Sequence, residues 1–164
     1  KSLKEAEGFE MNFFSSKTGD PYFRIKYQNI FTERPKVGFL KFGLAFLNVS
    51  DLKITIDLSH VEAMLLQSKW DEIAKNRAIK YATINPVNLT LVDGNRISHH
   101  FSGPKAKFIS SGEFRVWGKV TYQCNDDNQE FDEVVMFQDK EKNQLVIRKT
   151  KNGFDPLVLN FPIP

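Results

Sequence analysis

The residues best suited to chemistry in this chain are two neighbouring histidines and a single cysteine. His99 and His100 are adjacent in a segment predicted to be a strand, so their side chains point to opposite faces and cannot bind one metal ion together. We expect one histidine to be packed and the other to be exposed. Cys124 has no cysteine partner for an internal disulfide, and its place on the apolar face of a predicted strand indicates an unreactive, buried thiol.

An acidic cluster follows Cys124 and raises the question of calcium binding. The cluster lacks the central glycine and the final glutamate of an EF-hand loop, so we interpret it as a solvated hairpin whose charges protect a sheet edge. Its members are Asp126, Asp127, Glu130, Asp132 and Glu133. The sequence therefore predicts no metal site.

Motifs for catalysis and for cofactor binding are absent as well. The chain has no G-x-S-x-G, P-loop, G-x-G-x-x-G or H-E-x-x-H pattern. We predict a protein that is not an enzyme and has no cofactor. If it were an enzyme, the best candidates for catalytic residues would be His99, His100 and Asp132.

The composition is that of one globular domain spanning residues 1–164. Hydrophobic residues make up 41% and charged residues 26%, which excludes disordered and fibrous classes. The net charge of +3 is too small to indicate a nucleic-acid partner. The 15 phenylalanines supply apolar volume for a core and for an apolar groove. The chain starts at Lys1 rather than at Met, which leaves room for an upstream signal peptide or anchor.

Alternation of apolar and polar residues predicts strands along most of the chain. The fold class is therefore mostly β, an antiparallel jelly roll or sandwich, with 87–164 as its most regular portion. The first 20 residues are weakly patterned and are expected to be mobile. The predicted strands are 22–27, 52–58, 87–91, 96–101, 105–109, 113–124, 130–138 and 144–149, with a last one near 157–161.

Two segments before Pro86 differ from this pattern. Ser59 and Glu62 fit a capping box, and apolar residues at three- and four-residue spacing follow, which predicts an amphipathic helix over about 59–78. We expect this helix to cover an open end or face of the sheet. The segment Phe39–Phe46 is apolar but has neither the period of a strand nor that of a helix, so core packing and contact with a lipid or membrane both remain open.

The rhythm of the strands after Pro86 resembles the repeating unit of the lipopolysaccharide-export proteins LptC and LptA, the OstA-like group. The resemblance covers the C-terminal part only and rests on three stretches, Val87–Ser98, Gly103–Phe108 and Gly112–Tyr122. The elements of the repeat that it matches are Ala106, Gly118-Lys119-Val120, Glu130–Val134 and Asn143–Ile147. The helix and the phenylalanine-rich segment depart from the pattern of that family.

This resemblance implies a V-shaped β-jelly roll in the periplasm that binds lipid acyl chains in its interior and takes part in lipopolysaccharide transport. It also implies an inner-membrane anchor upstream of Lys1 and pairing of sheet edges with other β-jelly-roll transport proteins. The candidate lipid-binding residues form the inward face, and the same set would line an ordinary core: Phe108, Phe114, Val116, Val120, Tyr122, Val135 and Phe137.

An alternative class fits the same residues. In that interpretation the chain is a closed-core β-sandwich without a lipid ligand, a structural or protein-interaction domain that binds its partners through an edge strand or through the helix. An open interior would favour the lipid-binding class, and a sealed interior would favour the interaction class.

Overall fold

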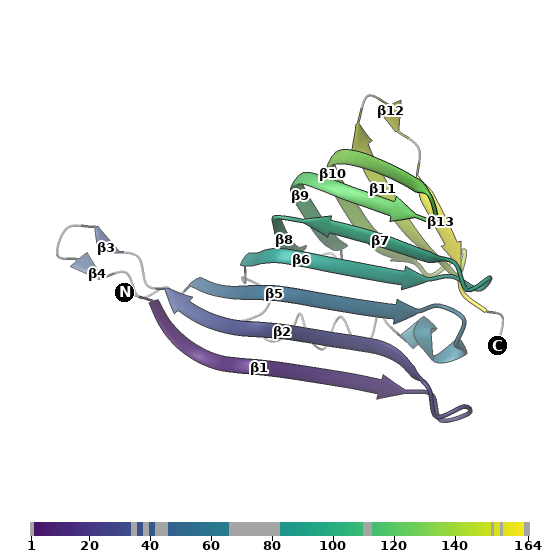
Figure 1. The fold of residues 1–164 in the computed structure, drawn as a ribbon, viewed down its shortest axis with the longest axis horizontal. Helices are drawn as coiled ribbons and strands as arrows, with labels where there is room; N and C mark the ends of the chain where they lie inside the picture. The colour runs from purple at the N-terminus through teal and green to yellow at the C-terminus, as the bar shows by residue number, and fades with distance from the viewer. Residues whose placement is uncertain are drawn as a thin grey trace.

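The protein is mostly β, as the sequence predicts, and is built around one 11-stranded sheet with a separate two-stranded sheet (Figure 1). The computed structural model describes residues 2–33, 36–37, 40–41, 46–65, 83–109, 113–151, 153–154 and 156–162. The strands are β1 (Ser2–Phe14), β2 (Pro21–Glu33), β3 (Lys36–Val37), β4 (Leu40–Lys41), β5 (Phe46–Asp57), β6 (Thr83–Val92), β7 (Ser98–Gly103), β8 (Lys105–Ile109), β9 (Glu113–Cys124), β10 (Asp127–Asp139), β11 (Gln144–Lys151), β12 (Gly153–Phe154) and β13 (Leu157–Asn160), and a short 3₁₀ helix, η1, spans Val61–Leu65.

The strand order in the large sheet is β1-β2-β5-β6-β7-β9-β10-β11-β12, with β8 between β6 and β9 and with β13 on β11. Neighbouring strands are antiparallel except β5 and β6, which run parallel. A parallel pair needs a crossover, and the chain between Asp57 and Thr83 makes it. The expectation of a purely antiparallel arrangement is wrong at this one pair, because alternation within single strands does not determine their relative direction.

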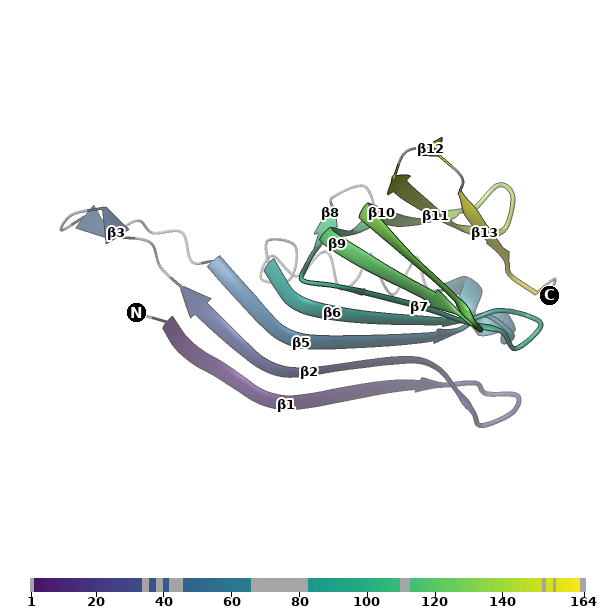
Figure 2. The ribbon, with the colours of Figure 1, turned by 45° about the horizontal axis from the view of Figure 1, so that its top comes forward.

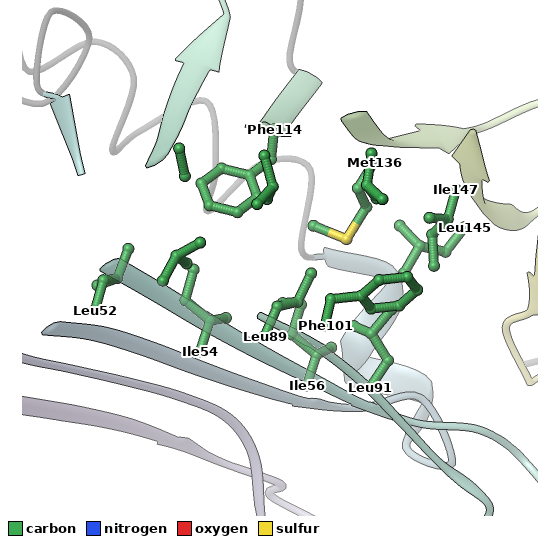
Figure 3. Close-up of a cluster of buried hydrophobic side chains, with 14 of the residues drawn as sticks. Leu52, Ile54, Ile56, Leu89, Leu91, Phe101, Phe114, Met136, Leu145 and Ile147 are labelled. Atoms are coloured by element: carbon green, nitrogen blue, oxygen red, sulfur yellow. The ribbon is translucent and has the colours of Figure 1, made fainter. Parts of the chain in front are cut away.

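The core lies between two halves of the same sheet. Figure 2 shows β9, β10 and β11 folded over β5, β6 and β7. In Figure 3, Ile54 and Leu89 from one half face Phe114 and Met136 from the other. These four side chains are between 0 and 3% exposed, so the two halves are packed against each other as the layers of a sandwich.

An irregular line crosses the sheet where the alternation of buried and exposed residues shifts by one residue in several strands. In β5, Val49 and Leu52 are both buried although an alternating strand would put them on opposite faces, and Asp51 between them has a φ of 54°. In β6 the same shift occurs between Ile84 and Val87. Because these residues are paired across the two strands, the shifts are adjacent and form one crease.

The crease continues into β9 and β10. Gly118 and Lys119 have φ values of 82° and 75°, and the register with β10 shifts between Phe131 and Glu133. Pro104, which separates β7 from β8, packs so closely on Gly118 that a Cβ there would be 2.9 Å from the proline Cγ. A bulge in this position bends the strands, which allows one sheet to close over its own face.

Before Pro86, the structure differs from the predicted pattern in one segment, and two other predicted segments lie partly outside the described residues. Residues 2–14, predicted as part of a weakly patterned segment, form the strand β1 on β2, so long regular strands are not confined to 87–164. Of the predicted helix over 59–78, the described part is the 3₁₀ turn η1, and 66–78 lie outside the described residues. The segment Phe39–Phe46 also lies largely outside them.

Candidate functional site

The predicted lipid-binding residues on β8 and β9 are brought together, but inside the closed core. All five side chains are between 0 and 5% exposed: Phe108, Phe114, Val116, Val120 and Tyr122. The ring centroids of Phe108 and Phe114 are 4.9 Å apart, which is a packed aromatic pair. A ligand would reach these residues only if the two halves of the sheet separated.

The other two predicted residues, Val135 and Phe137, lie on the opposite face of the sheet. The inward residues of β10 are Val134 and Met136, which are 1% and 3% exposed. The register shift after Phe131 is the reason, because it moves the alternation of β10 by one residue. The ring of Phe137 instead packs under the guanidinium of Arg148, at 4.6 Å from its centroid.

The histidines lie on opposite faces of β7, as predicted. His99 is 6% exposed, with Nδ1 2.8 Å from the hydroxyl of Tyr122 and Nε2 3.0 Å from Oδ2 of Asp93. A carboxylate only accepts hydrogen bonds, so Nε2 donates to Asp93, and in the neutral ring Nδ1 accepts from Tyr122. His100 is half-buried and pairs with Thr90, its Nδ1 2.9 Å from the Thr90 hydroxyl.

The electrostatics of this cluster favour a charged Asp93 and a neutral Tyr122. Burial alone would raise the pKa of Asp93, but hydrogen bonds from His99 and from the amides of Ile97 and Asn95 outweigh it and lower that pKa. Burial, together with neighbouring acidic groups, raises the pKa of Tyr122. The cluster thus fastens the turn between β6 and β7 to β9 through a satisfied polar network.

Within the described ranges, these residues are not gathered into a cluster of potential metal ligands. Both ring nitrogens of His99 are engaged, and the described part of the chain contains no group of three or more potential metal ligands. Cys124 is half-buried next to the core rather than fully buried, so the prediction of its burial holds only in part. The enzyme candidates His99, His100 and Asp132 do not converge, because the two histidines face opposite ways and Asp132 is exposed on β10.

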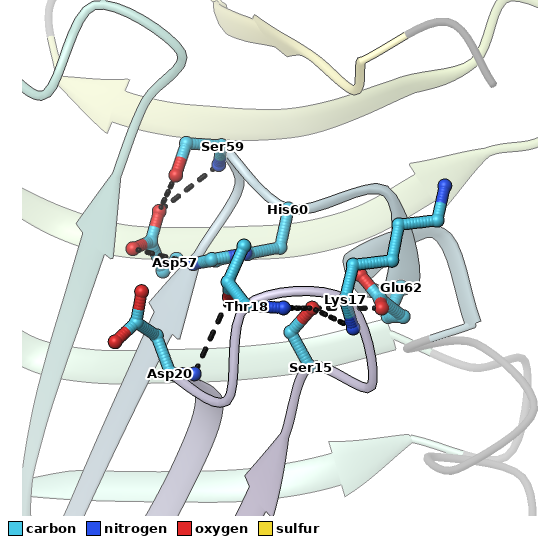
Figure 4. Close-up of polar contacts among 8 residues, drawn as sticks. All are labelled: Ser15, Lys17, Thr18, Asp20, Asp57, Ser59, His60 and Glu62. Carbon is cyan, nitrogen blue, oxygen red and sulfur yellow. Dashed lines mark hydrogen bonds and ion pairs between the residues drawn. The ribbon is translucent and has the colours of Figure 1, made fainter.

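A second polar cluster links the turn between β1 and β2 to η1, next to a local contact at the end of β5 (Figure 4). The hydroxyl of Ser15 donates to Glu62 at 2.8 Å, and the hydroxyl of Ser59 donates to Asp57 at 2.6 Å. The predicted capping box between Ser59 and Glu62 is therefore not formed, since each side chain is bound elsewhere. The backbone of Glu62, the hydroxyl of Ser15 and nearby Lys17 together lower the pKa of the Glu62 carboxyl despite some desolvation.

The sheet has an edge at β1 that sequence reasoning missed. In the described part of the chain, β1 is 13 residues long and pairs with β2 on one side only. Its register with β2 is regular from Ala6 to Phe13. The signal in the sequence is the alternation of Phe9, Met11 and Phe13, which the surrounding charged residues obscure.

The inner face of β1 and β2 is less completely covered than the core. Four apolar side chains there are half-buried and pack at the border of the buried cluster: Met11, Phe13, Tyr27 and Ile30. The face therefore continues the apolar interior toward the β1 edge, with Phe13 against Phe23 at a ring-centroid distance of 5.5 Å.

Comparison with protein-family models, with curated proteins and with solved structures finds no match to this chain. Among the described residues, no helix is both long enough and apolar enough to cross a bilayer.

Proposed function

We propose that this chain is a non-enzymatic docking domain that binds a partner by adding one of the partner's strands to the β1 edge. The observation that carries this proposal is the length of that edge, 13 residues with a strand on one side only in the described structure. An edge strand presents unpaired backbone N–H and C=O groups, and an extended segment can pair with them by β-augmentation.

The closed core supports a docking function over a function inside the sandwich. Phe114, Val120 and Phe101 are completely buried, so a partner finds no exposed surface between the two halves of the sheet. Binding at an edge needs no opening of that core.

The charges on β1 specify the chemistry of the partner strand. By sequence β1 carries Glu5, Glu7 and Glu10 against a single lysine, Lys4. On the neighbouring strand β2, Lys26 is opposite Glu10, whereas Asn29 is opposite Glu7. Because opposite charges attract across paired strands, we expect a partner strand that alternates apolar and basic residues.

A synthetic peptide copying Tyr22–Phe31 of β2 is a suitable probe, because its residues 23–27 alternate apolar and basic side chains. We expect it to bind the protein in a calorimetric titration. A control peptide of the same sequence, N-methylated at alternate residues, keeps the charges and side chains but loses backbone donors. We expect it to bind at least tenfold more weakly; equal binding of the two peptides would exclude strand addition.

A second candidate function, lipid carriage of the LptC type, is favoured by the half-buried face of β1 and β2. Met11, Phe13 and Tyr27 continue the apolar interior to a sheet edge, where an acyl chain gains about 25 cal/mol per Å² of apolar surface buried. The resemblance to lipopolysaccharide-export proteins supports this candidate. With it we propose a periplasmic location, an upstream inner-membrane anchor and edge pairing with similar domains.

Photo-crosslinking distinguishes this candidate from a sealed domain. With a photoreactive residue at Met11, we expect adducts to a lipopolysaccharide or phospholipid probe, since this side chain is half-buried at the border of the core. The matched control is the same residue at Phe114, which is completely buried and is expected to give no adduct. Adducts at neither position would reject lipid carriage on this face.

A further inference from the structure

Phe14 is the most exposed large apolar side chain in the described part of the chain. It lies at the last position of β1 and is 60% exposed. Met11 and Phe13 point to the core, where they are half-buried. Strand alternation therefore puts Phe14 on the opposite face, together with Glu10 and Asn12. An aromatic ring at the end of the free edge is thus available to a strand that pairs with β1.

The backbone at Phe14 is held in place by the turn that follows it. Ser15 is only 3% exposed, and its hydroxyl donates to Glu62 on η1 at 2.8 Å (Figure 4). The Ser15 amide donates to the carbonyl of Asp20 at 2.7 Å, and the Ser15 carbonyl accepts from the amide of Gly19 at 2.8 Å. Because the adjacent residue is fixed in this way, binding at the ring orders little backbone, which favours affinity.

Glu10 supplies a charge on the same face, four residues before Phe14. Its carboxylate is exposed, and Nε of Arg24 on β2 lies 4.0 Å from its Oε1. An exposed pair at this distance is weak, so the carboxylate can still attract a cation from a partner. Between the two positions, Asn12 accepts a hydrogen bond from Arg24 at 2.8 Å. The outer face of the edge therefore presents a carboxylate, an amide and an aromatic ring at alternate residues.

We infer that the β1 edge selects an antiparallel strand with an aromatic residue opposite Phe14 and a basic residue opposite Glu10. Aromatic pairs and opposite charges both stabilise paired strands. In an antiparallel partner the aromatic residue comes first, and the residues opposite Phe13 and Met11 are apolar because they face the core. The partner sequence is thus aromatic–apolar–polar–apolar–basic. This inference rests on the docking function proposed for β1 and adds a sequence preference to it.

The peptide that copies Tyr22–Phe31 is the probe, because it begins with such a sequence, Tyr-Phe-Arg-Ile-Lys. We expect Phe14→Ser in the protein, or Tyr22→Ser in the peptide, to weaken binding about tenfold. The two changes together should weaken it no more than one alone, since both remove the same contact. Val158→Ser is the matched control, because Val158 is also an exposed apolar residue, 41% exposed on β13, and its substitution should leave binding unchanged.

Charge reversal tests the register at Glu10. Lys26→Glu in the peptide should weaken binding to the wild-type protein, and Glu10→Lys in the protein should restore it, because opposite charges then face each other again. Absence of this rescue would overturn the assigned register.

The outcomes separate this inference from docking itself. Full affinity after Phe14→Ser or after Tyr22→Ser in the peptide would overturn the aromatic contact and leave docking at β1 intact, and additive losses would overturn it equally. Failure of the unchanged peptide to bind would overturn both the inference and the docking proposal. Chemical denaturation checks that Phe14→Ser is folded, and if it is not, the peptide variant with the wild-type protein decides.

Discussion

At the scale of single residues, the Asp93 carboxylate of the Asp93–His99–Tyr122 network makes the stability of the protein depend on pH. The lowered pKa of Asp93 means that its contribution to stability is present above the ordinary aspartate pKa, near 4, and is lost as the pH falls through the lower folded-state pKa. Asp93→Asn removes a charge-assisted hydrogen bond to a buried histidine, and we expect a loss of about 1–3 kcal/mol in the free energy of unfolding at pH 7.

Urea denaturation at several pH values measures both the pH dependence of stability and the loss of stability caused by Asp93→Asn. The difference between the wild type and Asp93→Asn should shrink on acidification below pH 4, because protonation removes the same charge from the wild type. Asp139→Asn is the control, since Asp139 also accepts a backbone hydrogen bond in a hairpin turn, from Lys142. A difference that stays constant down to pH 2 would contradict the assigned role of the Asp93 charge.

At the scale of elements, the close packing of β7 on β9 leaves no room for a side chain at Gly103. A Cβ at this position would come within 2.5 Å of Cγ1 of Val116, a completely packed side chain. We expect Gly103→Ala to lower the free energy of unfolding by about 1–3 kcal/mol, the usual range for overpacking a core. Gly94→Ala, in an exposed turn with no atom within 4 Å of the new Cβ, should change stability little. Chemical denaturation of the two variants side by side checks this, and equal midpoints would mean that the crease tolerates a side chain.

The strands β9 and β10 show which inward faces can be predicted from the sequence and which cannot. The inward face of β9 is predictable because Phe114, Val116 and Val120 keep an even spacing through the bulge. On β10 the spacing from Phe131 to Val134 is odd, so the bulge reverses the face of Val135 and Phe137. A bulge has no distinct signature in side-chain periodicity, and only the pairing with a neighbouring strand reveals it.

At the scale of the whole molecule, a mostly β class follows from strand patterns, but the folding of one sheet over itself does not. It depends on contacts between residues distant in sequence, such as Ile54 with its partner strand β6 and Phe114 across the core. The position of the free edge is equally non-local, since it depends on which strand is last in the sheet order. The candidate docking edge at β1 therefore emerges from the structure, although its acidic composition can be read directly from the sequence.

Hydrogen exchange of the β1 amides, with and without the peptide that copies Tyr22–Phe31, tests the docking proposal most directly. In an edge strand, alternate amides face away from the sheet and exchange readily, whereas those bonded to the neighbouring strand are protected. We expect the peptide to protect the previously unprotected amides between Ala6 and Phe13, and the N-methylated peptide to leave them unprotected. Peptide binding that leaves these amides unprotected, or that protects amides on β11 to β13 instead, would contradict docking at β1.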